Sequence, residues 1–255
     1  MPEPLLQIEG LTKRFGGVVA SDDVTLSIPQ GELHAIIGPN GAGKTTLIAQ
    51  LAGELPSQSG SIRFAGEDIT ALPTWRRSLR GLARSFQITS LFLDFTALDN
   101  VALAVQAHAG HSFHFWRDAR REAELREPAR AALERVGLGG RAGALVANMS
   151  HGEHRQIEMA IALATKPRML LLDEPMAGMG ADESARMVNL LRELKQELTI
   201  LLIEHDMDAV FALADRISVL VYGRIIASGE PAAIRANPDV RRAYLGEQQV
   251  VTLNG

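Results

Sequence analysis

Gly38-Pro39-Asn40-Gly41-Ala42-Gly43-Lys44-Thr45 fills every fixed position of the pattern G-x-x-x-x-G-K-[ST]. The apolar residues 34–37 before it predict a buried strand, and residues 46–51 after it predict the start of a helix. In this setting glycines let successive N–H groups turn toward a phosphate, and the helix N-terminus adds a positive field. A glycine turn without a ligand is the alternative, and the strand-to-helix context favours the phosphate loop.

Two side chains of this loop carry specific expectations. Lys44 is expected to reach the β- and γ-phosphates, and the Thr45 hydroxyl is expected to coordinate Mg²⁺.

A second stretch, residues 170–175, is an apolar strand that ends in the carboxylates Asp173 and Glu174. Asp173 is placed to hold Mg²⁺ through a water, and Glu174 to polarise an attacking water. Two solvated acids at a strand end are the alternative.

Bulk properties narrow the class of protein. The chain has 255 residues, a formal charge of −4 and no cysteine. This charge argues against a nucleic-acid or anionic-membrane protein held by bulk electrostatics, and the absence of cysteine suits the cytosol. The first four residues lack a basic-then-apolar signal pattern. No apolar run approaches the roughly 20 residues that span a bilayer, so we expect no membrane crossing by this chain.

Hydrophobic periodicity predicts the order of elements. Residues 5–28 predict antiparallel strands with a turn at 16–17, and residues 59–66 a further strand. Helices are expected over 117–136, 152–165 and 183–195, with Pro128 interrupting the first or starting a new one. The apolar runs 169–172, 200–203 and 217–220 predict strands of a parallel, buried sheet. Residues 229–244 predict a short helical tail with breaks at Pro231 and Pro238.

Together these motifs resemble the nucleotide-binding subunit of an ATP-binding-cassette (ABC) transporter, over roughly residues 6–247. Residues 148–153, Asn-Met-Ser-His-Gly-Glu, stand where the family signature belongs, with three of its commonest residues replaced. The resemblance implies an α/β fold: a P-loop ABC-type domain over residues 1–255 with an N-terminal antiparallel β subdomain. It also implies a helical subdomain inserted at about 74–165 and a helical tail at about 229–255.

The same resemblance implies roles for further residues. Ser150 and Gly152 would bind the γ-phosphate of an ATP held by an opposite subunit. Gln87 would sense Mg²⁺ and the attacking water, His205 would contact the γ-phosphate, and Phe15 would stack on adenine. The expected catalytic residues are Glu174, His205, Gln87 and Lys44, and the expected metal-site residues are Thr45, Gln87 and Asp173. The expected ATP-binding residues are Phe15, Gly38, Pro39, Asn40, Gly41, Ala42, Gly43, Lys44, Thr45, Thr46, Ser150 and Gly152.

One departure and one subgroup likeness qualify this reading. Gly180 stands where the family usually has an aspartate, which puts carboxylate contacts across a dimer in doubt. Residues 174–180, His151 and residues 243–247 resemble ATPases of branched-chain amino-acid uptake systems, and residues 108–121 resemble the longer of their two ATPase subunits. Urea-type and related importers share these features.

Other residues favour simpler interpretations. His108, His111 and His114 recur every third residue and suggest a metal site, but a solvated or partner-facing loop is favoured. His151 and His154 are expected on the surface of the signature helix. The arginines at 76, 77, 80 and 84 are expected on a solvated helix face rather than on nucleic acid. The apolar cluster Leu91, Phe92 and Phe95 is expected at an interface with a membrane subunit.

The combined expectation is an ATP-hydrolysing subunit of an importer, with ATP and Mg²⁺ as ligands. Its substrate would be branched-chain amino acids or similar small polar solutes. Expected partners are a second ATPase subunit (an identical copy or a paralogue), transmembrane permease subunits and, indirectly, a solute-binding protein. The chain would lie peripherally on the cytoplasmic face of the inner membrane. The alternatives are an ATPase of a urea importer or of a lipid-export system, and a soluble ABC protein that acts on DNA or ribosomes.

Overall fold

The computed structural model describes residues 3–85, 91–109 and 123–242. The chain forms two compact units, Met1–Arg77 with Leu191–Gly255 and Ser78–Leu190. It passes from one unit to the other within α2 (Thr74–Leu79) and returns within α6 (Ala181–Leu194). None of the described helices is both long and apolar enough to cross a membrane.

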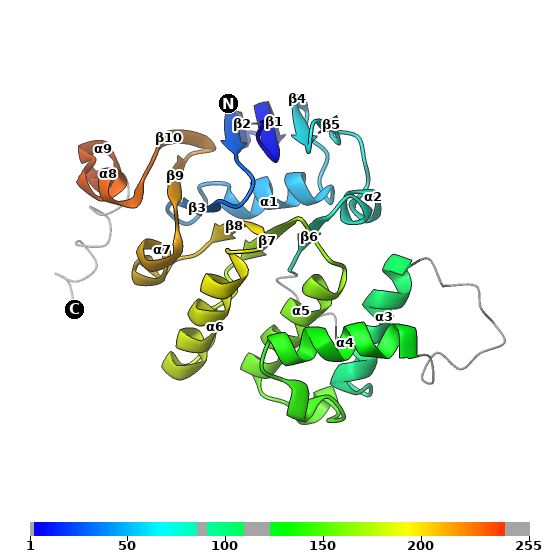
Figure 1. The fold of residues 1–255 in the computed structure, drawn as a ribbon. Coiled ribbons are helices and arrows are strands. Elements are labelled where there is room, and N and C mark those ends of the chain that lie inside the picture. The colour runs from blue at the N-terminus through cyan, green and yellow to red at the C-terminus, as the bar shows by residue number, and fades with distance from the viewer. Residues whose placement is uncertain (1–2, 86–90, 110–122, 243–255) are drawn as a thin grey trace. The chain divides into compact units, whose positions relative to one another are not determined.

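The first unit opens with an antiparallel sheet of four strands (Figure 1). Their order is β2-β1-β4-β5, with bounds β1 (Leu6–Phe15), β2 (Val18–Ile28), β4 (Ser59–Phe64) and β5 (Glu67–Asp68). β1 and β2 pair from Leu6 opposite Ile28 to Phe15 opposite Val18, so the predicted turn at 16–17 is confirmed. From Val24 to Ile28 alternate positions of β2 are buried, the period expected of a sheet with one covered face.

A second set of strands in this unit carries the phosphate loop. In order they are β10 (Arg224–Gly229), β9 (Arg216–Val221), β3 (Leu33–Ile37) and β8 (Thr199–Ile203). β3 pairs in parallel with both β8 and β9, and every residue of β3 and β8 is buried. The predicted parallel pairing is therefore confirmed, and β3 is held on both sides immediately before the loop.

A buried polar chain adds to this support of β3. The His34 ring is fully buried, with Nδ1 2.7 Å from Glu32 Oε1 and Nε2 2.8 Å from Ser218 Oγ. Ser218 Oγ in turn donates to Ser228 Oγ at 2.9 Å. These contacts tie β3 to β9 and β10 by side chains as well as by the backbone. They also satisfy a histidine that would be costly to bury alone.

The helices of the first unit are α1 (Lys44–Ala52), α7 (Met207–Leu213), α8 (Pro231–Ala236) and α9 (Pro238–Val240). Figure 1 shows α1 beside the antiparallel strands. The predicted break at Pro238 is confirmed, since α8 ends at Ala236 and the extended residue Asn237 separates it from α9. Pro231 does not break the tail but starts it, and each proline is the first residue of its helix. Proline fits there because the first helical N–H has no partner within the helix.

The second unit holds two strands and a group of helices. β6 (Leu82–Arg84) pairs in parallel with β7 (Met169–Asp173), and α3 (Ala97–Ala109), α4 (Ala123–Arg135) and α5 (His151–Ala164) pack together (Figure 1). Two short 3₁₀ turns, η2 (Gly139–Arg141) and η3 (Val146–Asn148), precede α5. Pro128 lies inside α4, so it neither ends nor starts that helix. The buried face of α4, which includes Leu125, Ala129 and Leu133, holds the helix together across the missing N–H.

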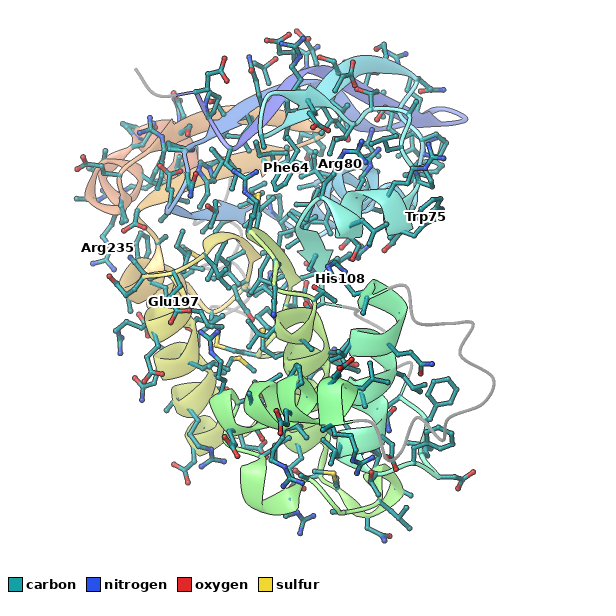
Figure 2. The ribbon with its side chains drawn as sticks, turned by 45° about the vertical axis from the view of Figure 1, so that its right-hand side comes forward. Phe64, Trp75, Arg80, His108, Glu197 and Arg235 are labelled. Carbon is teal, nitrogen blue, oxygen red and sulfur yellow. The ribbon has the colours of Figure 1, made fainter. Side chains whose placement is uncertain are left out.

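Arg77 corrects another expectation, that of a solvated arginine face. Its side chain is buried, and its guanidinium donates to the carbonyls of Gln50 and Leu51 at the end of α1 and of Thr70 and Leu72. Burial lowers the pKa of Arg77 to about 10. Arg76 and Arg80 do lie exposed, as expected, and the Arg76 guanidinium lies 5.0 Å from the ring centroid of the exposed Trp75, which is labelled in Figure 2. Arg77 therefore closes the C-terminal end of the helix that starts at the phosphate loop.

Candidate functional site

The phosphate loop connects β3 to α1, and two of its glycines are required by close packing. A Cβ at Gly38 would lie 2.0 Å from the carbonyl oxygen of Leu220. A Cβ at Gly43 would lie 1.9 Å from the carbonyl oxygen of Ala20, and Gly43 has φ 104. Any side chain at either position would displace the backbone. The loop is thus held against two neighbouring strands.

Lys44 is the cation of this loop. Its side chain is buried, and Nζ donates to the carbonyls of Gly38 at 2.7 Å and Pro39 at 3.0 Å. Lys44 is also the first residue of α1, whose N-cap Gly43 has no side chain to accept from the first N–H groups. A buried ammonium beside a helix N-terminus makes a strongly anion-attracting loop. The chemistry of these donors fits a polyphosphate.

The remaining loop residues range from buried to exposed, so part of the loop is anchored and part can contact a ligand. Gly38 and Ala42 are buried, while Pro39, Gly43 and Thr46 are half-buried. Asn40, Gly41 and Thr45 are exposed. The Thr45 hydroxyl is therefore open to a metal ion, whose preferred ligands are oxygens.

Phe15 and His205 also belong to the first unit. Phe15 ends β1 with 49 % of its surface exposed, and Lys13 Nζ lies 5.4 Å from its ring centroid. His205 follows β8 and is exposed, and its backbone N–H donates to Glu204 Oε2 at 3.0 Å. Asp206 caps α7 by accepting from the N–H groups of residues 208 and 209. The backbone around His205 is thus fixed by carboxylates on both sides.

The two acidic residues lie in the second unit, at the end of β7. Asp173 is buried, and Arg84 Nη2 from the adjacent β6 lies 3.3 Å from its Oδ2. Arg84 itself is on a strand with a nearly buried side chain, so its expected place on a solvated helix face is wrong. Its charge is balanced by Asp173, as burial of an ion requires.

Glu174 has an unusual backbone conformation. Its φ is 53, in the left-handed region that non-glycine residues seldom adopt, and its carbonyl accepts from the Ala177 N–H at 3.1 Å. Such strain costs about 1–3 kcal/mol and is typical of functional positions.

Ser150 and Gly152 stand at the start of α5. Ser150 Oγ accepts from the Glu153 N–H at 3.2 Å, while Glu153 Oε2 accepts from the Ser150 N–H at 2.8 Å. This reciprocal capping box shapes the helix start. The Glu183 carboxylate lies over Gly152, where an added Cβ would meet its Oε1 at 2.3 Å. Sequence reasoning missed Glu183, although an acid in the first turn of the following helix was its visible signal.

Several sequence expectations have a different outcome. Gln87, His111 and His114 lie outside the described residues, and His108 lies near the end of α3. Within the described ranges no three metal-ligating side chains gather into a cluster. His154 is half-buried, with Nε2 2.8 Å from the Val146 carbonyl, so it is more than a surface residue. A Cβ at Gly180 would meet nothing within 4 Å, which leaves room for a side chain there.

The predicted residues thus form one group in each unit. The first unit brings together residues 38–46 and also carries Phe15 and His205; the second carries Ser150, Gly152, Asp173 and Glu174. The phosphate loop after a buried parallel strand defines a nucleotide-binding α/β protein. The roles of the individual residues stay predictions.

Comparison with known proteins identifies the family. The family model described as "ABC transporter" matches residues 21–177, and that of the "Branched-chain amino acid ATP-binding cassette transporter" matches residues 224–249. The chain belongs to the ABC transporter family, as its motifs predicted, and is an ATPase of that family.

Relatives match over nearly the full length. The chain is 40 % identical over 254 residues to the high-affinity branched-chain amino acid transport ATP-binding protein BraF of Pseudomonas aeruginosa, covering 97 % of this chain and 100 % of the relative. It is 39 % identical to LivG of Escherichia coli K12 with the same coverage. At 36 % identity it also matches the Fe(3+) ions import ATP-binding protein FbpC of Agrobacterium fabrum, over 95 % of this chain and 66 % of the relative.

Solved structures confirm the predicted fold class. The ADP conformation of MJ1267, an ATP-binding cassette of an ABC transporter, superposes with a TM-score of 0.84 and 31 % identity, covering 95 % of this chain and 99 % of that one. The cbiO1 protein of Clostridium perfringens, part of the cbiONQ transporter complex, has a TM-score of 0.78 and 28 % identity, with 98 % of each chain covered. The α/β cassette fold is therefore established for this chain.

Proposed function

We propose that this chain is the ATP-binding and ATP-hydrolysing subunit that powers import of branched-chain amino acids. The evidence for branched-chain amino acids as the transported solute is the match of residues 224–249 to the branched-chain family model. Full-length relatives named for that transport support it. The match to an Fe(3+) importer ATPase shows that the cassette itself is compatible with other cargoes. The C-terminal segment therefore contributes more to the assignment than the phosphate loop does.

The phosphate loop supplies the binding half of the mechanism. Lys44 and the N–H groups at the start of α1 hold the β- and γ-phosphates of ATP, and the exposed face of Phe15 stacks on the base. Thr45 and Asp173 are the residues that would hold Mg²⁺, which when bound neutralises developing charge on the phosphates. The oxygen donors of both side chains fit this ion.

The remaining predicted residues act on hydrolysis. Glu174 accepts a proton from the attacking water, while His205 donates a hydrogen bond to the γ-phosphate and Gln87 orients the water. Ser150 and Gly152 present the helix start of one subunit to the nucleotide held by a second ATPase subunit, identical or paralogous. Closure of the two subunits then drives the permease as a two-state motion. The domain boundaries predicted above stay part of this proposal.

Membrane attachment is proposed at an exposed aromatic surface of the second unit. Phe92 and Leu93 are 57 % and 52 % exposed, and the Phe92 and Phe95 ring centroids lie 5.3 Å apart. The buried Asn100 side chain holds this turn by accepting from the Phe92 N–H and donating to the carbonyls of Phe92 and Thr96. A rigid turn that exposes apolar side chains is suited to docking. We place a permease segment here, which puts the chain on the cytoplasmic face of the membrane.

Phe92→Asp is expected to abolish assembly with the permease while leaving ATP binding by the isolated subunit nearly unchanged. A carboxylate buried beneath a docked segment costs about 2 kcal/mol or more. The measurement compares nucleotide binding in solution with co-purification from membranes. Tyr222→Asp, at an 80 % exposed aromatic on the β9–β10 turn, is the control and should assemble normally. Normal assembly of the Phe92 variant would move the docking surface elsewhere.

The assignment as a whole is tested by isolating the chain from membranes and identifying its partners by mass. The complex, reconstituted in liposomes with its solute-binding protein, should take up labelled leucine, isoleucine and valine only when ATP is present on the side of this subunit. Excess unlabelled valine should compete, and urea should not. Preferential uptake of urea, or recovery without any permease, would overturn the proposed function.

A further inference from the structure

The first unit contains a small cavity next to the phosphate loop and the His205 loop. Its volume is about 210 Å³, and its walls are Ile37, Phe211, Ile234 and Val240, with Met207, Asp208 and Arg235 completing the lining. Drug-sized ligands occupy pockets of roughly 300–1,000 Å³. This cavity therefore fits a smaller metabolite, of about the size of an amino acid.

The cavity walls come from three parts of the chain with distinct roles. Ile37 is the last residue of β3 and directly precedes Gly38 of the phosphate loop. Met207 and Phe211 belong to α7, which starts two residues after His205. Ile234, Arg235 and Val240 belong to α8 and α9, inside the segment that matches the branched-chain family model. The cavity thus lies beside the phosphate loop and the His205 loop, and it is also lined by the segment that matches the branched-chain family model.

Polarity divides the cavity into an apolar floor and a charged rim. Ile37, Ile234 and Val240 are at most 2 % exposed, whereas Asp208 and Arg235 are exposed. The Arg235 guanidinium lies 4.2 Å from the Phe211 ring centroid, and Figure 2 shows its side chain at the surface. Neither Asp208 nor Arg235 forms a side-chain ion pair with another of the described residues. One carboxylate and one guanidinium are thus available above an aliphatic floor.

We propose that this cavity binds a free branched-chain amino acid and that the bound ligand slows ATP hydrolysis; the regulatory role rests on the proposed function. Its α-ammonium pairs with Asp208 and its α-carboxylate with Arg235, a charge-assisted pairing that a guanidinium favours. Its branched side chain packs on the half-buried side chains of Met207 and Phe211, above the buried Ile37, Ile234 and Val240. A zwitterion with a short aliphatic side chain matches both the charges and the floor, whereas a simple anion or a hydrocarbon matches only one of them.

Inhibition follows from where the ligand sits. A molecule packed between Ile37, α7 and the C-terminal helices holds the start of α7, and with it the His205 loop, in one position relative to β3. Any movement of His205 toward the phosphates then has to break ligand contacts, so the ligand favours the arrangement that does not hydrolyse. Imported amino acid accumulating beside this subunit would thereby reduce its own uptake.

The first experiment measures binding by the purified full chain, using calorimetry and ligand-observed NMR with L-leucine. Saturable binding is expected, with isoleucine and valine competing. Leucinamide, which lacks the carboxylate, and 4-methylpentanoate, which lacks the ammonium, should bind about tenfold or more weakly, because each loses a charge-assisted pair. Absence of leucine binding, or equal binding of both analogues, would overturn the proposal.

Variants then locate the site and test the regulation. Arg235→Gln and Asp208→Asn should each weaken leucine binding about tenfold or more and keep basal ATP hydrolysis. Arg216→Gln, at an exposed arginine of β9 outside this cavity, is the control and should bind leucine normally. Leucine should lower hydrolysis by the unaltered chain and by the control but not by Arg235→Gln.

The outcomes separate this inference from the transport assignment. If the reconstituted complex takes up leucine but the purified chain does not bind it, the cavity is not a leucine-binding site and the transport assignment is unaffected. Binding that Arg235→Gln leaves intact would place the ligand elsewhere, and binding without any change in hydrolysis would overturn the regulatory role. Failure of branched-chain uptake, with leucine binding still present, would overturn the transport assignment and leave the binding site standing.

Discussion

The Lys44→Met protein is expected to bind ATP about 10²-fold more weakly and to hydrolyse none above background. Lys44 Nζ is the buried cation of the phosphate loop, held by the carbonyls of Gly38 and Pro39. Charged hydrogen bonds contribute about 1.5–3 kcal/mol each, so loss of the phosphate contacts alone accounts for this change. Methionine keeps the apolar stem of the side chain, which limits any effect on packing. Nucleotide titration and a phosphate-release assay measure the two quantities.

Lys195→Met is the matched control for this substitution. Lys195 Nζ also donates to a backbone carbonyl, that of Leu213 at 3.0 Å, but it lies outside the phosphate loop and pairs with Asp215. We expect this variant to bind and hydrolyse ATP normally. Circular dichroism should show both variants folded. Normal ATP affinity and turnover in Lys44→Met would overturn the role of the loop as the nucleotide site.

Glu174→Gln is expected to retain ATP binding while hydrolysis falls by about 10²-fold or more, the contribution of a general base. Glutamine has the same shape as glutamate without its basicity. Glutamine would have to adopt the same left-handed backbone conformation that Glu174 adopts at φ 53, so the turn after β7 should be preserved. With ATP and Mg²⁺, a closed dimer should accumulate and be resolved by size-exclusion chromatography, with the partner ATPase added if the dimer is mixed.

Glu193→Gln provides the comparison for Glu174→Gln, since it makes the same change at an exposed position of α6. It should hydrolyse ATP like the unaltered protein and show no extra dimer. Undiminished hydrolysis by Glu174→Gln would remove Glu174 from the role of base. Loss of ATP binding together with hydrolysis would instead indicate a structural role for this residue.

The fold class and the positions of most elements could be predicted because their signals are local. The phosphate loop needs a buried strand before it and a helix after it, and β3 and α1 are found there. Alternation of apolar and polar residues predicted β1 and β2, and continuous apolar runs predicted β7, β8 and β9. In each case neighbouring residues alone decide the pattern of burial or of turn geometry.

The errors arose where a distant partner outweighs the local preference. Arginine is mostly found at the surface, yet Arg77 is buried because four carbonyls accept from it, and Arg84 because Asp173 balances its charge. Pro128 remains inside α4 because the apolar face of that helix is covered. Gln50 and Leu51 lie far from Arg77 in the sequence, as Asp173 does from Arg84, whereas Thr70 and Leu72 lie a few residues before Arg77.

The sequence by itself determined that this chain is an ATP-binding cassette with a phosphate loop and an acid-ended strand, since those motifs are contiguous. Only the tertiary structure decided that Glu174 adopts a left-handed backbone, that the Glu183 carboxylate covers Gly152, and that Phe92 is exposed beside Phe95. The cavity between Ile37, α7 and the C-terminal helices is likewise a feature that only the tertiary structure decided. The contact of Glu183 with Gly152 and the walls of the cavity depend on packing between residues far apart in the chain. The Glu174 turn and the Phe92–Phe95 contact are local, and none of these features is encoded by periodicity within one segment.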